Sequence, residues 1–182
     1  MVLLSTPVCD FGQLPSDFSL LNVDGKAWTL QQCQGEKGLL VMFICNHCPY
    51  VKSIIKRIVR DADDLSLLGI NSVAIMSNDV ERYPDDSFKN MQRFAAEHQF
   101  SFPYLLDRDQ SVAKAYGAVC TPDFFGYNAD LQLQYRGRLD ESGMEAIPNA
   151  NRDLFEAMKQ IAKRGCGPKE QIASMGCSIK WR

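Results

Sequence analysis

The feature that most constrains this fold is a pair of cysteines between an apolar run and an amphipathic segment. Residues 38–44, G-L-L-V-M-F-I, have the length and composition of a strand buried on both faces. Cys45 and Cys48 follow, and Pro49 opens a segment with apolar residues at helical spacing: Val51, Ile54, Ile55, Ile58, Val59, Ala62 and Leu65. The pattern therefore predicts that both cysteines lie at a strand-to-helix turn.

The rest of the chain extends this turn into an α/β fold. Gly69 ends the helix and residues 70–77 predict a second strand, so residues 38–77 form a unit of two parallel strands joined by a helix. Further expected elements are a hairpin within 18–30, helices over 85–98, 109–116 and 153–163, and strands over 102–106, 123–127 and 131–138. We expect a single domain over residues 1–182, with a core at about 12–164 and a glycine-punctuated tail at 165–182.

Composition excludes several classes of partner. The chain is 46% apolar and 23% charged with a net charge of −2, and it has no polybasic run, so we expect neither nucleic acid nor an anionic membrane surface as a partner. Its first residues lack the basic region and long apolar core of a secretory signal. No stretch reaches the ~18 apolar residues needed to span a bilayer. These features predict a cytoplasmic protein.

The position of the two cysteines favours redox chemistry. At a helix N-terminus the free N–H groups and the helix dipole stabilise a thiolate. We therefore expect Cys45 to be an exposed nucleophile and Cys48 to be the resolving thiol that closes a disulfide with it. His47 is expected to place positive charge or a hydrogen-bond donor near the Cys45 sulfur, which would make the pair more oxidising.

A metal site is the main alternative for this motif. Structural zinc needs four ligands, and the sequence has no second C-x-x-C. A copper carrier that uses Cys45, His47 and Cys48 stays open as a less favoured alternative, and we predict neither a metal nor a cofactor. A chance pair of cysteines is disfavoured because the strand and the helix around them are the context that the redox motif requires.

Thr121 and Pro122 form a second constellation. Proline can simply mark a sheet edge or a turn. It can also form a cis-proline loop that packs against the dithiol and offers backbone groups to a substrate. Cys120 lies two residues before Pro122 and is either an inert buried thiol or a third redox thiol that could trap a mixed disulfide.

Other polar residues and cysteines are given ordinary roles. Cys166 and Cys177 flank the tail and could bridge it, although two reduced thiols are favoured in a reducing compartment. Asp79, Asp85 and Asp86 are expected to be exposed and to cap a helix rather than to bind a cation. Arg136 and Arg138 alternate on a predicted strand and are assigned to the surface.

The chain resembles a thioredoxin-fold protein of the peroxiredoxin-like branch of the alkyl hydroperoxide reductase/thiol-specific antioxidant (AhpC/TSA) superfamily. The stretches that carry the resemblance are F-I-C-N-H-C-P-Y-V-K (43–52), S-N-D-V-E-R-Y-P-D-D-S (77–87), F-P-Y-L-L-D (102–107), A-K-A-Y-G-A-V-C-T-P-D-F-F (113–125), Y-R-G-R-L-D (135–140) and G-C-S-I-K-W (176–181). The resemblance implies a central mixed sheet flanked by helices, an N-terminal hairpin, and Pro122 in cis facing the dithiol. It implies no bound cofactor.

The resemblance also implies a thiol–disulfide oxidoreductase that acts on a disulfide-containing protein or a small thiol. Asn46, Thr121, Pro122 and Cys120 would then contact the substrate. A peroxiredoxin carries Thr or Ser three residues before its peroxidatic cysteine, and Cys45 occupies that place if Cys48 is the matching cysteine. Peroxide reduction is therefore the alternative, and dithiol exchange is preferred. A typical thioredoxin has Trp where this chain has Ile44 and a buried Asp where it has Leu39, so the usual proton shuttle is missing.

Overall fold

The fold is built on a mixed seven-stranded sheet. In this computed structural model, which describes residues 3–182, the strand order is β3-β2-β6-β5-β4-β8-β9. The strands are β2 (Ser19–Asn22), β3 (Ala27–Thr29), β4 (Gly38–Phe43), β5 (Ile70–Met76), β6 (Tyr104–Leu106), β8 (Asp123–Asn128) and β9 (Leu133–Tyr135). The β4–β5 and β5–β6 pairs are parallel and the other pairs are antiparallel. The expected mixed sheet and the expected N-terminal hairpin, β2–β3, are confirmed.

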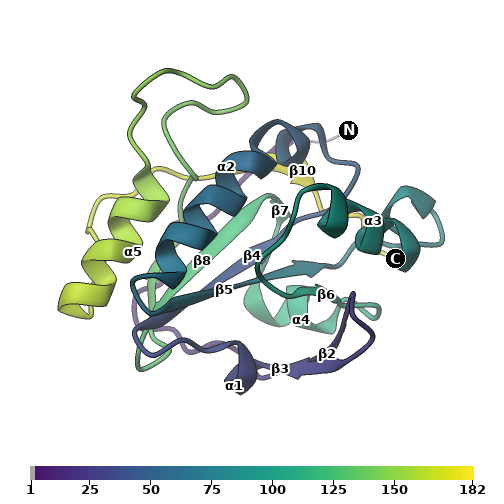
Figure 1. Ribbon diagram of the computed structural model, residues 1–182, viewed down its shortest axis with the longest axis horizontal. Helices are drawn as coiled ribbons and strands as arrows, with labels where there is room; N and C mark the ends of the chain where they lie inside the picture. The colour runs from purple at the N-terminus through teal and green to yellow at the C-terminus, as the bar shows by residue number, and fades with distance from the viewer. Residues whose placement is uncertain (1–2) are drawn as a thin grey trace.

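Helices cover both faces of this sheet (Figure 1). One face packs against α2 (Pro49–Ser66), α3 (Phe88–Glu97) and α5 (Asp153–Arg164), and the other against α1 (Leu30–Cys33) and α4 (Ser111–Tyr116). The side chains of β4 alternate between the two cores: Leu40 and Met42 enter the first, and Leu39, Val41 and Phe43 enter the second. This explains why β4 is a continuous apolar run. In the described residues no helix is long and apolar enough to cross a membrane.

The tail adds a strand that the sequence pattern did not indicate. A second sheet has the order β1-β10-β7, made of β1 (Leu3–Ser5), β10 (Met175–Ser178) and β7 (Cys120–Thr121), all antiparallel. Gly176 allows the close approach of β10 to β7, because a Cβ at this position would overlap the Thr121 carbonyl oxygen. Figure 1 shows β10 beside β7, near the start of α2. The tail therefore lies next to the cysteine turn.

The helix expected over 85–98 is divided into two pieces. A 3₁₀ turn spans Pro84–Asp86, and α3 begins only at Phe88, because Ser87 has an extended backbone (φ −57°, ψ 154°). Asp86 is fully buried and its carboxylate contacts the backbone of Asn46, so it does not cap α3. Asp79 is also buried, at 3% exposure, and only Asp85 is exposed as expected.

Arg136 does not lie on the surface. It is 7% exposed and forms an ion pair with the buried Asp123, with a 2.9 Å distance between Nη2 and Oδ2. It also donates to the Gly117 carbonyl and lies over the Phe125 ring. Arg138, expected on the same face, is the more exposed of the two and pairs with Asp153. Strand β9 ends at Tyr135, so neither arginine lies in the strand expected over 131–138. The surface assignment of Arg136 was wrong because its partner comes from another strand.

Candidate active site

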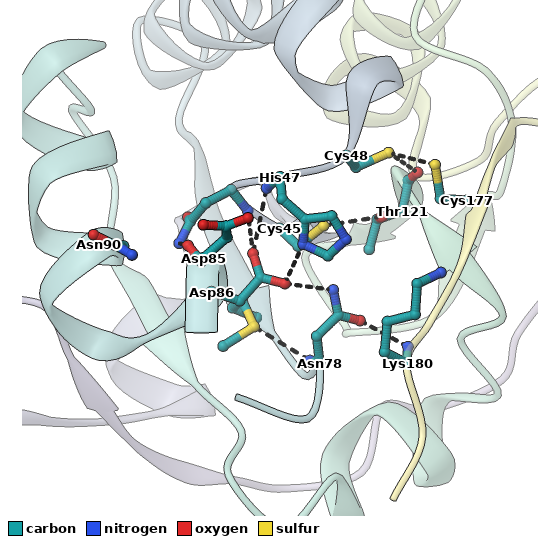
Figure 2. Close-up of polar contacts among 12 residues, drawn as sticks. Cys45, His47, Cys48, Asn78, Asp85, Asp86, Asn90, Thr121, Cys177 and Lys180 are labelled. Carbon is teal, nitrogen blue, oxygen red and sulfur yellow. Dashed lines mark hydrogen bonds and ion pairs between the residues drawn. The ribbon is translucent and has the colours of Figure 1, made fainter. Parts of the chain in front are cut away.

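The cysteine turn is a buried loop between β4 and α2. Strand β4 ends at Phe43 and α2 begins at Pro49, as the apolar run and the N1 proline predicted. Cys45 is only 1% exposed and Cys48 is 0% exposed. The expectation of an exposed first thiol is therefore wrong, and Thr121 of β7 and Cys177 of β10 lie against the two thiols (Figure 2).

The Thr121–Pro122 segment packs directly against both thiols. Cys45 Sγ lies 3.4 Å from Thr121 Oγ1, and Cys48 Sγ lies 3.1 Å from the Thr121 carbonyl oxygen. The Thr121–Pro122 peptide bond is cis. The cysteine turn and the Thr121–Pro122 segment thus form one site, although the contacting residues are 76 and 73 positions apart in the sequence.

Cys48 is the sulfur with the greater stabilisation as a thiolate. It is the N-cap residue of α2, and its Sγ lies 3.0 Å from Cys177 Sγ and 3.1 Å from the Thr121 carbonyl oxygen. As a thiolate Cys48 can accept hydrogen bonds from the Cys45 and Cys177 thiols, and these interactions outweigh burial and lower the pKa of Cys48 to about 4, with the Cys45 thiol contributing most. As a neutral thiol Cys48 instead donates to the Thr121 carbonyl or to Cys177 Sγ.

Cys45 is shifted in the opposite direction. Its hydrogen bond to Cys48, its burial and the negative charge of Asp86 all raise the pKa of Cys45 well above its usual value. These opposite shifts favour Cys48 as the thiolate of the pair, with the shared proton on Cys45. The sequence instead predicted Cys45 as the nucleophile.

The loop is held in shape by Asp86, a residue that sequence reasoning placed at a helix cap. Asp86 Oδ1 accepts from the backbone amides of Asn46 (2.8 Å) and His47 (3.3 Å). Its Oδ2 contacts His47 Nδ1 at 2.6 Å and accepts from Asn78 Nδ2 at 2.8 Å (Figure 2). The only signal in the sequence was a Pro-Asp-Asp turn some 40 residues away, and nothing in its spacing pointed to the cysteine loop.

His47 is paired with this carboxylate. The hydrogen bond to Asp86 raises the pKa of His47, while burial opposes the shift. The imidazole also stacks on Tyr83, with 5.6 Å between ring centroids and 5° between ring planes. The positive charge expected near Cys45 is therefore balanced by a negative charge on Asp86, which acts on the thiol in the opposite sense.

Two residues expected to contact substrate have other partners. Asn46 is 6% exposed, donates to the Asp85 carbonyl at 3.1 Å and accepts from the Tyr104 hydroxyl at 2.8 Å. Cys120 is fully buried and its thiol contacts the Pro122 carbonyl at 3.6 Å. Asn46 therefore fixes the loop, and burial raises the pKa of Cys120, which leaves it neutral.

Three side chains at the loop have the composition of a partial metal site. Cys45, His47 and Asp86 each place one ligand atom within 4.8 Å of the others. The two oxygens of Asp86, however, are already engaged by four hydrogen-bonding groups. A metal ion would have to break contacts that hold the loop, so we interpret the cluster as a hydrogen-bonded support for the dithiol.

An apolar cleft of about 330 Å³ opens beside the cis-proline. Its lining includes Tyr50, Pro122, Phe124, Leu139, Met144 and Met175. Tyr50 lies in the first turn of α2 and Pro122 follows Thr121, so the cleft lies close to the cysteine turn, although neither Cys45 nor Cys48 lines it. Of the four residues expected to contact substrate, Pro122 borders this cleft, and Asn46 borders a separate pocket that His47 also lines.

Solved structures confirm the fold. An uncharacterized conserved protein from Geobacillus kaustophilus has 42% sequence identity and a TM-score of 0.94, with 100% of this chain and 97% of that chain covered. The thioredoxin domain of a thiol-disulfide oxidoreductase from Bacteroides vulgatus has a TM-score of 0.65 at 12% identity, covering 84% of this chain and 97% of that chain. At that identity the likeness concerns the fold alone, which is thioredoxin-like.

Sequence relatives point to the same group. Thiol-disulfide oxidoreductase ResA from Halalkalibacterium halodurans is 24% identical over 106 residues, which are 58% of this chain. The chain spans just over half, 56%, of the length of that curated relative. The model of the AhpC/TSA family matches residues 11–141, a region that contains β2 to β9 and both cysteines of the turn. The chain therefore belongs to the AhpC/TSA family.

Proposed function

We propose that this chain catalyses thiol–disulfide exchange with Cys45 and Cys48, and that Cys48 is the attacking thiolate. The observation that carries this proposal is the position of Cys48 at the N-terminus of α2, with the Cys177 thiol 3.0 Å from its Sγ and the Cys45 thiol lowering its pKa. The thiolate is the form of cysteine that attacks a disulfide. The membership of the AhpC/TSA family and the similarity to a thiol-disulfide oxidoreductase support the same chemistry.

The reaction proceeds in two exchange steps. The Cys48 thiolate attacks one sulfur of a substrate disulfide, forming a mixed disulfide and releasing the other substrate sulfur as a thiolate, which takes a proton. Cys45 then loses its proton and attacks Cys48 Sγ, which forms the Cys45–Cys48 disulfide and releases the second substrate sulfur. The substrate gains two electrons and the dithiol loses two. Run backwards, the same steps oxidise a substrate dithiol.

Access to Cys48 decides which substrates can react. A disulfide-containing chain that occupies the apolar cleft beside Pro122 would place its sulfur near the turn. Because Cys48 is 0% exposed, β10 must shift before a protein sulfur reaches it. A cytoplasmic location belongs to this proposal, since a reducing compartment keeps the dithiol ready to reduce disulfides.

A thiol peroxidase is the second candidate, and the burial of Cys48 favours it. A small hydroperoxide needs less space than a protein disulfide. The Cys48 thiolate would attack the peroxide oxygen, giving a sulfenic acid and an alcohol or water, and Cys45 would then form the disulfide with loss of water. Cys45 stands where peroxiredoxins carry a Thr or Ser hydroxyl, so the group that would orient the peroxide is replaced by a thiol.

The two candidates are separated by parallel assays. Wild type, Cys45→Ser and Cys48→Ser are each given a protein disulfide with dithiothreitol as reductant, and separately a hydroperoxide. We expect wild type to reduce the disulfide and both variants to fall to the uncatalysed rate. Cys166→Ser, which alters an exposed thiol outside the site, is the matched control and should keep full activity.

The peroxidase is supported instead if wild type consumes hydroperoxide rapidly, Cys45→Ser still does so, and disulfide reduction stays at background. Stoichiometric Cu(I) binding in the absence of both activities would identify a carrier. In that case the metal would have to break the hydrogen bonds of Asp86, and the NMR signals of the His47 ring would shift.

A further inference from the structure

The C-terminal strand occupies the sheet edge beside the dithiol. In the β7–β10 pair Cys177 lies opposite Thr121, the residue that contacts both thiols of the turn. Ser174 Oγ donates to the Pro122 carbonyl at 3.0 Å, on the N-terminal side of β10. The backbone that the sequence assigned to substrate is thus paired with the chain's own tail.

Hydrogen bonds also hold the tail on the C-terminal side of β10, at Lys180. The Lys180 amide donates to Asn78 Oδ1 at 2.8 Å, and the Lys180 carbonyl accepts from Gln110 Nε2 at 2.8 Å and from the Asp79 amide at 2.9 Å. Asn78 also donates to Asp86, which holds the cysteine loop. The tail is therefore bonded to the same network as the dithiol, on both sides of Cys177.

This placement brings a third sulfur into contact with the attacking one. Cys177 Sγ lies 3.0 Å from Cys48 Sγ, and Cys177 is 2% exposed (Figure 2). A disulfide bond is about 2.05 Å long, so a movement of about 1 Å would bring the two sulfurs to bonding distance. Cys48 thus lies between two thiols, Cys45 and Cys177, each of which can form a disulfide with it.

We propose that Cys177 is a third redox thiol of this site and that the tail acts as an internal thiol substrate of the Cys45–Cys48 disulfide. Cys177 Sγ attacks Cys48 Sγ, so that a Cys48–Cys177 bond forms and the Cys45–Cys48 bond breaks. The electron pair leaves on Cys45 Sγ, which takes up the proton lost by Cys177. One disulfide and one thiol are present before and after the step, and no outside oxidant or reductant is consumed.

The exchange leaves the number of protons unchanged, because the proton that Cys177 loses is taken up by Cys45. Burial raises the pKa of the Cys177 thiol to about 11, and the pKa of Cys45 is raised as well. Little Cys177 thiolate is therefore present at neutral pH and Cys45 is a poor leaving group, so the step is expected to be slow, and the short distance between the Cys48 and Cys177 sulfurs is what favours it. The step links the tail covalently to the site, which holds β10 in place. It rests on the proposed function only in using the Cys45–Cys48 disulfide as its starting point.

The test is a map of disulfides after oxidation with diamide, by digestion without reductant and mass spectrometry. In wild type we expect both a Cys45–Cys48 peptide and a Cys48–Cys177 peptide. In Cys45→Ser we expect the Cys48–Cys177 disulfide in nearly every chain, and in Cys177→Ser only the Cys45–Cys48 disulfide. Cys166→Ser, the matched control, should give the wild-type map.

The proposal is overturned if Cys177 stays fully open to alkylation in oxidised Cys45→Ser while Cys48 is consumed in other products. If that variant does not fold, the exchange is tested in wild type treated with less than one equivalent of diamide. Conversion of the Cys45–Cys48 peptide into the Cys48–Cys177 peptide with time supports the exchange. A disulfide map that contains the Cys45–Cys48 peptide alone refutes it. Disulfide reduction by wild type without any Cys48–Cys177 product refutes this inference and leaves the proposed function intact. If the Cys48–Cys177 disulfide forms but the protein reduces no substrate disulfide, this inference is supported and the proposed function is refuted.

Discussion

Replacement of Asp86 by Asn gives a direct test of how the cysteine loop is held. The substitution keeps the shape of the side chain and removes its charge and one acceptor oxygen. If the remaining oxygen faces the amides of Asn46 and His47, the new NH₂ group faces His47 Nδ1 and Asn78 Nδ2. Two buried hydrogen bonds to a charged group are then lost. Each is worth about 1.5–3 kcal/mol, so Asp86→Asn should reduce the free energy of unfolding by about 3–6 kcal/mol.

The size of this loss should depend on pH in a known direction. The folded pKa of His47 is raised by Asp86 above the unfolded value of about 6.5. A group with a raised folded pKa contributes its full stabilisation below the unfolded pKa and loses it as the pH rises through the folded pKa. The difference in the free energy of unfolding between wild type and Asp86→Asn should therefore be largest at about pH 5.5. At about pH 8.5 it should be smaller by the contribution of the His47–Asp86 hydrogen bond, about 1.5–3 kcal/mol. At the higher pH neutral His47 can accept from the new amide.

Urea unfolding of both proteins at the two pH values, with a reductant present to keep the thiols reduced, measures this difference. Titration of the His47 ring signals by NMR should show a lower pKa in Asp86→Asn. Asp85→Asn is the matched control, since Asp85 is exposed and contributes its backbone carbonyl to Asn46, and it should change stability by less than about 0.5 kcal/mol. A loss in Asp86→Asn that is the same at both pH values, or an unchanged His47 pKa, would refute the role of the ion pair.

Three further predictions follow from other contacts. Thiolate ultraviolet absorbance should show one thiolate per chain at about pH 6, because the pKa of Cys48 is lowered to about 4, and the signal should disappear in Cys48→Ser but persist in Cys33→Ser. Arg136→Met should destabilise the fold by about 3–5 kcal/mol in thermal or urea unfolding, because it leaves the Asp123 carboxylate buried without its partner. Arg138→Met, at a more exposed ion pair, is the control and should cost about 1 kcal/mol or less. Equal losses in the two variants would contradict this explanation. A Cys48–Cys177 disulfide in Cys45→Ser would close a loop of 129 residues and raise the free energy of unfolding by about 5 kcal/mol over the reduced form. Calorimetry with and without reductant measures this difference. If the disulfide is present and stability does not rise, the bond cannot form in the native fold without strain.

Local pattern was sufficient for the framework that positions the site. The apolar run of β4 and the helical spacing of α2 depend on burial of neighbouring residues, so their periodicity is visible in the chain itself. Pro49 at the first position of α2 and Gly117 after α4, with φ +63°, follow from backbone sterics in the same way. These signals placed both cysteines at one turn.

The chemistry within that turn was decided by residues that are distant in sequence. Asp86, Thr121 and Cys177 contact the cysteine loop from 39 to 129 residues away, and no spacing in the chain encodes such contacts. Both thiols are buried, the shifts in pKa favour Cys48 as the thiolate, and the tail lies where a substrate strand was expected.

The sequence by itself determined that this chain has a strand, a dithiol and a helix in succession, because backbone geometry and burial are local constraints. Only the tertiary structure decided which of the two sulfurs carries the charge and which third sulfur lies beside it. Thiol pKa values respond to donors, charges and burial within a few ångströms, and those neighbours are brought together by folding alone.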